Sequence, residues 1–230
     1  MKNRLLTKVL AFALLLSTLS MTPVFAEASP SKDKTKEPID TAVVERIISC
    51  GGGYIDGYPD GTFRPEKLLT RAEAAALIAK LQHLPLTDKR ADTSSYVDGW
   101  YNAYINAVVK SGYMKGYPNG AFEPNEPIMR GEFAKVLSGF LSGKAAPSPF
   151  KDMEGSWAKE AVDMVYAQGI IKGYEDNTFR PTCDVTRAEA VAMLNRTFKI
   201  KKATDGKISF SDVSEGHWAY DDILSAAGYR

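Results

Sequence analysis

The sequence predicts a mainly helical fold, in which three helix-loop-helix repeats pack in a pseudo-threefold arrangement around a shared apolar centre. Three observations lead to this prediction. Segments of 22 residues that start at Gly57, Gly116 and Gly173 align without a gap. Each segment ends in apolar residues at helical spacing. A helix pair of this size cannot close a core alone, so three of them have to bury their apolar faces together.

The N-terminal segment 1–26 has the pattern of a secretory signal peptide. Three basic side chains precede an apolar run at 9–16, and small residues stand at 24 and 26, where a signal peptidase would cleave. The apolar run is too short to span a bilayer, so we expect no transmembrane segment in the mature chain. Residues 27–38 are small and charged, and we expect them to form a flexible leader.

Composition argues against several classes of partner and site. The 230 residues carry 29 basic and 28 acidic side chains, and removal of segment 1–26 lowers the formal charge from +1 to −2. This balance gives no electrostatic footprint for a nucleic acid or an anionic membrane. With two His and two Cys, we expect no metal and no cofactor. Whether Cys50 and Cys183 pair stays open, because the geometry of a bridge cannot be read from sequence.

The repeats divide the chain into 39–83, 96–142, 150–199 and an incomplete further copy at 210–230. The second and third repeats begin with an aromatic residue, an Asp, a Trp and a helical pattern. The first has only a short counterpart without Trp, and the last copy stops before its loop and second helix.

Each repeat is predicted to contain a first helix, a loop and a second helix. In the second repeat, one face of the first helix holds Tyr104, Ile105, Val108 and Val109. Turn chemistry follows, and three loop positions can take a positive φ: Gly61, Gly120 and Asn177. The aromatic residues two positions later are expected to anchor the loops in the core, and these are Phe63, Phe122 and Phe179.

The second helix has the clearest start signal. Thr70 with Glu73, and Thr186 with Glu189, fit the capping box, in which the Thr hydroxyl and the Glu carboxylate each accept from a backbone amide. In the second repeat Met129 replaces the Thr, so its helix with Glu132 should start less firmly. The capping role also explains the three Glu residues better than catalysis or metal binding does.

An arginine recurs at the first position of each second helix, as Arg71, Arg130 and Arg187. A cation there opposes the helix dipole at a cost of about 0.3–1 kcal/mol, so something should compensate. Free amides and a guanidinium together would receive a carboxylate or phosphate. Alternatively, each Arg pairs with an Asp or Glu of a neighbouring repeat and fixes the packing. The residues alone leave both interpretations open.

Aromatic residues near these positions have two interpretations. Trp100, Trp157 and Trp218 could stack on sugar rings or plug the core, and the tyrosines beside the turns could line a groove or pack the turn: Tyr58, Tyr117 and Tyr174. There is no Ser/His/Asp or Cys/His set and no phosphate-binding loop, so we do not expect an enzyme.

The blocks GYPDGTFRP with LTRAE and GYEDNTFRP with VTRAE resemble S-layer homology modules. The resemblance implies a central helical bundle and a non-catalytic anchor in the cell wall or S-layer. It also implies binding of a secondary cell wall polysaccharide with pyruvylated N-acetylmannosamine. The residues that it suggests for glycan binding are Arg71, Arg187, Arg130, Arg64, Arg180, Tyr58, Tyr174 and Trp157. The second repeat has Glu123 in place of Arg64 and Arg180, so we expect its groove to be weaker.

Two alternatives to a simple anchor remain. The chain could be the anchoring part of a wall-active enzyme whose catalytic region is absent from it. It could also be a self-assembling S-layer protein in which the arginines serve protein contacts. The sequence leaves the oligomeric state open.

Overall fold

The computed structural model describes residues 53–86, 99–202 and 209–228. The predicted signal peptide, the leader, the N-terminal part of the first repeat and Cys50 lie outside these residues. The described part is helical, as expected, and its helices are α2 (Arg71–Leu81), α3 (Asn102–Lys110), α4 (Arg130–Ser138), α5 (Lys159–Ala167), α6 (Arg187–Thr197) and α7 (Tyr220–Ala226).

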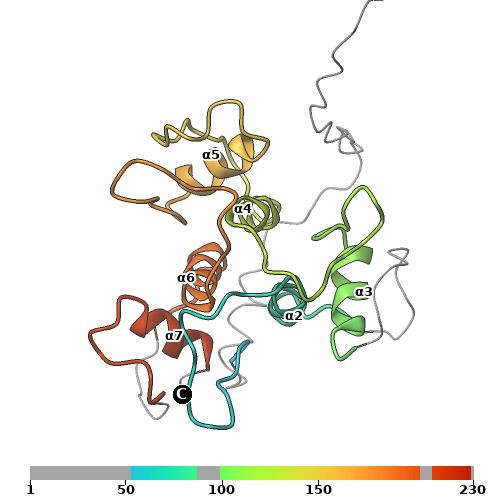
Figure 1. The fold of residues 1–230 in the computed structure, drawn as a ribbon, viewed down its shortest axis with the longest axis vertical. Helices are drawn as coiled ribbons and strands as arrows, with labels where there is room; N and C mark the ends of the chain where they lie inside the picture. The colour runs from blue at the N-terminus through green and yellow to red at the C-terminus, as the bar shows by residue number, and fades with distance from the viewer. Residues whose placement is uncertain (1–52, 87–98, 203–208, 229–230) are drawn as a thin grey trace, which may run out of the picture.

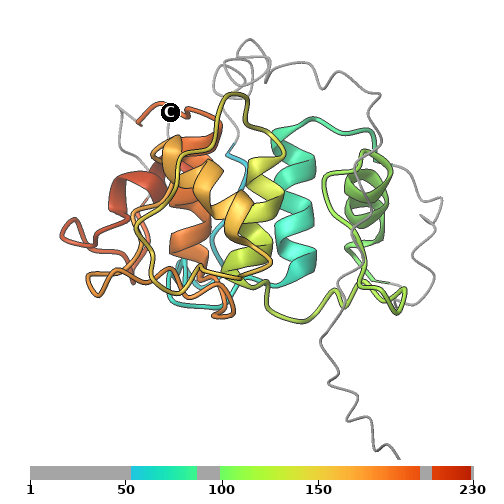
Figure 2. The same ribbon diagram turned by 90° about the horizontal axis from the view of Figure 1, so that it is seen from above.

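The helices form an inner and an outer set. In Figure 1 the inner helices α2, α4 and α6 are seen almost end-on, and α3, α5 and α7 lie outside them. Figure 2 shows the inner helices side by side. Each inner helix packs against the outer helix that follows it in sequence, in the pairs α2 with α3, α4 with α5 and α6 with α7. The first and second helices of one predicted repeat therefore belong to different packed pairs, which periodicity could not reveal.

A closed triangle of backbone hydrogen bonds joins the chain just before the three inner helices. The Leu69 amide donates to the Val185 carbonyl at 2.8 Å, the Ile128 amide to the Leu69 carbonyl at 2.9 Å, and the Val185 amide to the Ile128 carbonyl at 3.0 Å. All three side chains are buried. This cyclic pattern joins each repeat to both others directly before its second helix.

The local predictions for the second helices are confirmed. The Thr70 hydroxyl accepts from the Glu73 amide, and Thr186 does the same for Glu189, both at 3.2 Å. Met129 makes no side-chain cap, so α4 starts without the hydroxyl that the other two helices have. The apolar stripe of α2 is buried, as are the three loop anchors Phe63, Phe122 and Phe179.

The loops adopt the predicted left-handed turn residues, with φ of 80° at Gly61, 83° at Gly120 and 57° at Asn177. A second left-handed position was not predicted. Arg64, Glu123 and Arg180, which occupy the same place in the three loops, also have positive φ. In two of these loops an aspartate side chain of another segment accepts from the backbone amide at this position, which holds the residue in a costly conformation.

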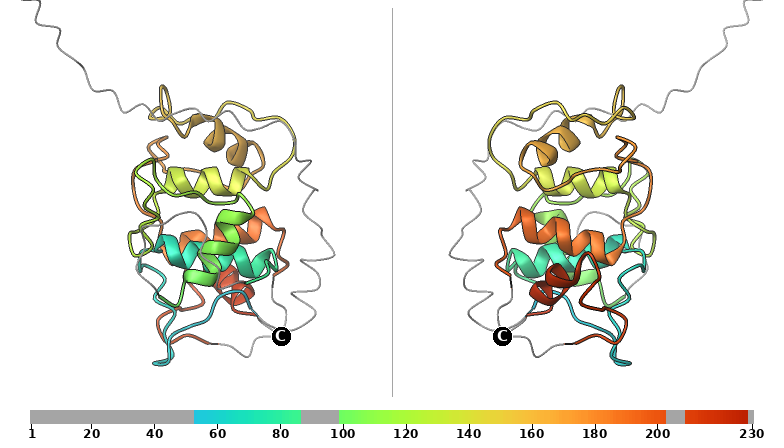
Figure 3. Two further views of the ribbon diagram at one scale, coloured as in Figure 1. Left: turned by 90° about the vertical axis from the view of Figure 1, so that its right-hand side faces the viewer. Right: turned by 90° about the vertical axis from the view of Figure 1, so that its left-hand side faces the viewer.

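The C-terminal copy at 210–228 packs against the first repeat. Figure 3 shows this segment beside the chain around residues 53–65, and the Ala226 carbonyl accepts from the Tyr54 amide at 3.0 Å. The sequence suggested a further repeat cut short. In the structure the segment lies next to the first repeat, whose N-terminal part is short and lacks the Trp of the other repeats.

Candidate functional site

The three helix-start arginines are buried and hold the loop of a neighbouring repeat. Arg71, Arg130 and Arg187 are 4%, 6% and 5% exposed. Their Nε atoms donate to the carbonyls of the loop anchors, at 2.8 Å to Phe122, 3.0 Å to Phe179 and 3.0 Å to Phe63. These carbonyls supply part of the compensation that a cation at a helix start requires.

The backbone amides at the helix starts are already used. The Arg187 and Ala188 amides donate to the Lys67 and Pro65 carbonyls at 2.9 and 3.0 Å, and α2 and α4 make the corresponding bonds to the loops of the second and third repeats. The interpretation in which free amides help to receive an anion is therefore excluded for these helix starts. The physical reason is that a neighbouring loop supplies carbonyl acceptors at the same place, so only the guanidinium groups remain for a ligand.

Aromatic rings of the same loops cover each guanidinium. The Arg187 guanidinium carbon lies 5.1 Å from the Tyr58 ring centre and 4.6 Å from that of Phe63. Tyr117 with Phe122, and Tyr174 with Phe179, cover Arg71 and Arg130 in the same way at 4.4 to 4.9 Å. The predicted groove tyrosines thus lie beside the arginines, where cation-π attraction offsets part of the cost of burial.

The three arginines differ in their carboxylate partners. The Arg130 Nη1 atom lies 2.6 Å from the Glu189 carboxylate, and the Arg71 Nη1 atom lies 3.4 Å from that of Glu132. Arg187 makes no ion pair within the described part of the chain, and its Nη2 atom donates to the Asp56 carbonyl at 3.0 Å. Burial lowers the pKa of Arg187 below its ordinary value, and the nearby Tyr58 and Glu73 side chains offset only part of this effect.

Lys67 explains why Arg187 lacks a carboxylate. Glu73 occupies the place that Glu132 and Glu189 have beside the other arginines, but it lies 2.7 Å from the Lys67 ammonium. Burial alone would raise the pKa of Glu73, and hydrogen bonds from Lys67 and the Thr70 amide lower it below its usual range. The other loops have Glu126 and Cys183 at the Lys67 position, so no cation there competes for the carboxylate.

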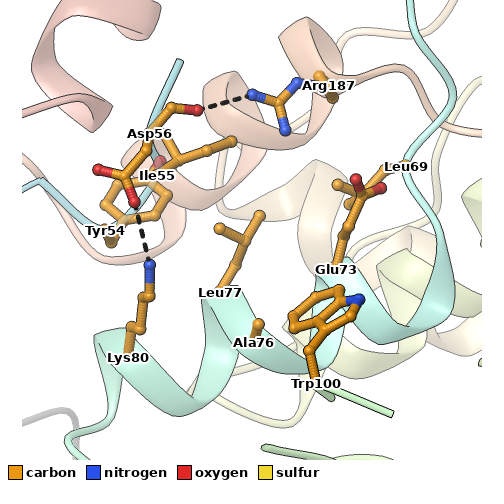
Figure 4. A pocket seen from close by; sticks show the side chains of 10 residues that line it. All are labelled: Tyr54, Ile55, Asp56, Leu69, Glu73, Ala76, Leu77, Lys80, Trp100 and Arg187. Carbon is orange, nitrogen blue, oxygen red and sulfur yellow. Dashed lines mark hydrogen bonds and ion pairs between the residues drawn. The ribbon is translucent and has the colours of Figure 1, made fainter. Parts of the chain in front are cut away.

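A hollow of about 170 Å³ lies beside Arg187 (Figure 4). Arg187 enters it from α6, while Glu73, Leu77 and Lys80 come from α2. The remaining lining residues are Tyr54, Ile55, Asp56, Leu69, Ala76 and Trp100. The Lys80 ammonium lies 3.5 Å from the Asp56 carboxylate. This hollow combines the buried Arg187 guanidinium with apolar side chains and with two carboxylates, Asp56 and Glu73, each of which is paired with a lysine. A comparison of the repeats at the Lys67 position is the sequence signal that could have identified it.

Arg64 and Arg180 lie on the surface, and each covers a tyrosine ring that also contacts a buried arginine. Arg64 bridges Asp60 at 2.9 Å and covers the Tyr58 ring at 3.9 Å, and Arg180 makes the same contacts with Asp176 and Tyr174. Hydrogen bonds from Thr62, then from Arg64, lower the pKa of Asp60 to about 2.

The three tryptophans have different environments. Trp157 is half-buried, and a Cβ on Gly131 would come within 2.9 Å of its ring, so the glycine makes room for it. The corresponding helix positions in α2 and α6 are Ala72 and Ala188. Trp100 and Trp218 are 63% and 59% exposed. Trp100 lines the hollow, which makes it a better candidate for sugar stacking than Trp157.

Neither a metal cluster nor a membrane span is found in the described part of the chain. Residues 53–86, 99–202 and 209–228 hold no group of three or more His, Cys, Asp or Glu side chains placed to bind a metal ion. None of the helices within these ranges has the length and apolar character that crossing a membrane requires. Cys183 is exposed, and Cys50 lies outside the described residues, so whether the two cysteines pair stays open.

Comparison with known proteins decides the family. The model of the S-layer homology domain matches residues 52–75, 91–134 and 149–191. This chain is an S-layer homology domain protein. A cellulosome-anchoring protein of Acetivibrio thermocellus is 37% identical over 191 residues, which are 77% of this chain and 42% of the relative. The S-layer protein sap of Bacillus anthracis is 40% identical over 156 residues, which are 64% of this chain and 19% of that protein.

A third relative carries an enzyme name. A protein of Bacillus anthracis named as a cell wall amidase is 35% identical over 161 residues, covering 66% of this chain and 30% of that protein. This S-layer homology protein therefore spans less than half the length of the relatives described. The family and the relatives together point to a secreted protein of the cell wall or cell surface.

Proposed function

We propose that this S-layer homology protein anchors to the bacterial envelope, without catalysis, by binding an acidic secondary cell wall polysaccharide in the hollow beside Arg187. The observation that carries the proposal is the buried Arg187 guanidinium, which has no carboxylate partner among the described residues while both other helix-start arginines have one. A buried charge is costly unless an opposite charge accompanies it. A carboxylate on the glycan would supply that charge.

The walls of the hollow support this choice of ligand class. A guanidinium edge favours a planar carboxylate such as that of a pyruvyl group. The exposed Trp100 ring offers an apolar face to the sugar that carries it. Pyruvylated N-acetylmannosamine combines both features, and the family resemblance suggests it independently.

The three arginine sites should differ in strength. Glu189 and Glu132 already neutralise Arg130 and Arg71, so a ligand carboxylate would have to displace them. We therefore assign the main site to Arg187 and weaker sites to Arg71 and Arg130. Arg64, Arg180, Tyr58 and Tyr174 act by shaping the loops around the guanidinium groups, and Trp157 acts by packing on α4.

Lys67→Ala tests the proposal without removing the arginine. Loss of the Lys67 ammonium frees Glu73 to pair with Arg187, so we expect binding of purified wall polysaccharide to fall at least about tenfold. Cys183→Ala at the equivalent position of the third loop is the matched control and should bind normally. Isothermal titration calorimetry measures both, and circular dichroism checks the fold. Equal affinity of Lys67→Ala and wild type would contradict the assignment of the site.

The relative named as an amidase favours one extension of this proposal. The anchor could belong to a longer wall-active protein, because the chain matches only 30% of that relative. The genomic reading frame beyond codon 230 tests this extension. A continuing frame that encodes a catalytic domain would support it, and a stop codon there would argue against it.

A further inference from the structure

The C-terminal copy holds the loop of the first repeat in the way that the start of the third repeat holds its own loop. The Asp212 carboxylate accepts from the Phe63 and Arg64 amides, both at 2.7 Å. In the third repeat, Asp152 accepts from the Phe179 and Arg180 amides at 2.9 and 2.7 Å. The two aspartates thus make the same pair of bonds, one of them across 148 residues of sequence and the other across 28.

Aromatic packing repeats the same correspondence. The Phe210 ring lies against Gly57, where an added Cβ would come within 2.3 Å of it. The Phe150 ring lies against Gly173 in the same way, and an added Cβ there would also clash with the ring. Phe210 also contacts the loop anchor Phe63, with ring centres 5.3 Å apart. The segment 210–228 therefore supplies to the first repeat the contacts that residues 150–167 supply to the third.

The Arg187 side chain binds the same loop through two backbone carbonyl groups. Its guanidinium donates to the carbonyls of Phe63 and Asp56, each at 3.0 Å. The amide of Phe63 is held by Asp212, and the amide of Ile55, next to Asp56, is held at 3.4 Å by the Ala226 carbonyl at the end of α7. The loop that orients Arg187 is thus fixed at both ends by the C-terminal copy.

We propose that Asp212 is a positioning residue for the Arg187 hollow, so that binding of the acidic sugar depends on the seating of the C-terminal copy against the first repeat. This proposal rests on the proposed function. When the C-terminal copy leaves, the Phe63 and Asp56 carbonyls lose their fixed positions. The Arg187 guanidinium then loses the two acceptors that aim its remaining edge into the hollow, and the Tyr54 and Ile55 wall of the hollow moves with the loop.

Asp212→Asn and Asp152→Asn in the full chain form a matched pair. The side chains keep their size. In each variant an NH2 group replaces one of the two carboxylate oxygens that accept from the loop amides, and the negative charge is lost. With the methyl glycoside of pyruvylated N-acetylmannosamine as the probe, we expect Asp212→Asn to weaken binding about tenfold. Asp152→Asn acts on the loop of Arg130 and should leave the affinity within about twofold of the wild type. Equal weakening by both variants would overturn the positioning role.

Measurements without sugar separate this proposal from the proposed function. In nuclear magnetic resonance spectra, Asp212→Asn should speed hydrogen exchange of the Phe63 and Arg64 amides and shift the Arg187 Nε–H signal. Asp152→Asn should instead shift the Arg130 Nε–H signal. An unmoved Arg187 signal in a folded Asp212→Asn variant would overturn the positioning role even if the probe binds. Failure of the wild type to bind the probe, with the Arg187 signal moved as expected, would contradict the proposed ligand and leave the positioning role supported.

Hydrogen exchange of the wild-type protein tests the proposal even if the Asp212→Asn variant fails to fold. Because sugar binding and seating of the C-terminal copy are coupled, saturating probe should slow exchange of the amides that this copy holds, at Tyr54, Phe63 and Arg64. Unchanged exchange at these amides in a protein that binds the probe would overturn the coupling.

Discussion

Arg130→Ala should destabilise the protein more than Arg187→Ala, because Arg130 has a close carboxylate partner and Arg187 has none within the described residues. The Arg130 side chain is 7% exposed and that of Glu189 23%, at a separation of 2.6 Å. Removal of one partner from a buried ion pair costs about 3–5 kcal/mol. Glu189 retains some solvent, so we expect a loss near the lower bound, about 3 kcal/mol, with about 1 kcal/mol more for the Phe179 carbonyl that loses its donor.

Arg187→Ala provides the comparison. This change removes the hydrogen-bond donor of two backbone carbonyls and leaves no carboxylate of the described residues without its ion-pair partner. We therefore expect the free energy of unfolding to fall by about 2 kcal/mol. Urea unfolding followed by circular dichroism, with linear extrapolation of the free energy of unfolding, measures both values. The double variant Arg130→Ala with Glu189→Gln should recover part of the loss, because the unpaired charge is then gone. The reasoning is refuted if Arg130→Ala costs no more than Arg187→Ala.

Two further predictions concern single side chains. Met129→Thr should raise the free energy of unfolding by about 1 kcal/mol in the same urea assay. Met129 has the same extended backbone as Thr70, so a hydroxyl at this position can accept from the Glu132 amide. An unchanged free energy of unfolding would contradict this prediction. The Asp60 carboxyl should titrate near pH 2 by nuclear magnetic resonance, and Thr62→Ala should raise that midpoint. Since this pKa is lowered on folding, its contribution to stability is present above about pH 4 and is lost as the pH falls toward 2. A midpoint at the ordinary Asp value would show that the Thr62 and Arg64 contacts do not persist in solution.

The features that the sequence predicted well depend on neighbours within a few residues. The Thr70 and Thr186 caps need only an amide three positions on, and the positive φ of Gly61 depends on its own missing side chain. Phe63 was placed in the core by its position after the turn. These features follow from short-range sterics and hydrogen bonding, which the local sequence contains.

The features that the sequence did not predict are contacts between repeats. Both interpretations of the arginines fit the local pattern, and only the arrangement of the inner helices shows that neighbouring loops occupy the helix-start amides. The role of Lys67 depends on Glu73 of the same repeat and Arg187 of another. The seating of the C-terminal copy on the first repeat joins residues 148 positions apart, beyond the reach of any local pattern.

The most direct test of the account is a titration of the wild-type protein with pyruvylated N-acetylmannosamine, observed at the arginine Nε–H signals by nuclear magnetic resonance. The account predicts that the Arg187 signal shifts with the lowest sugar concentration, while those of Arg71 and Arg130 stay in place because Glu132 and Glu189 already neutralise them. Binding that leaves the Arg187 signal unmoved, or that shifts all three signals equally, would contradict it.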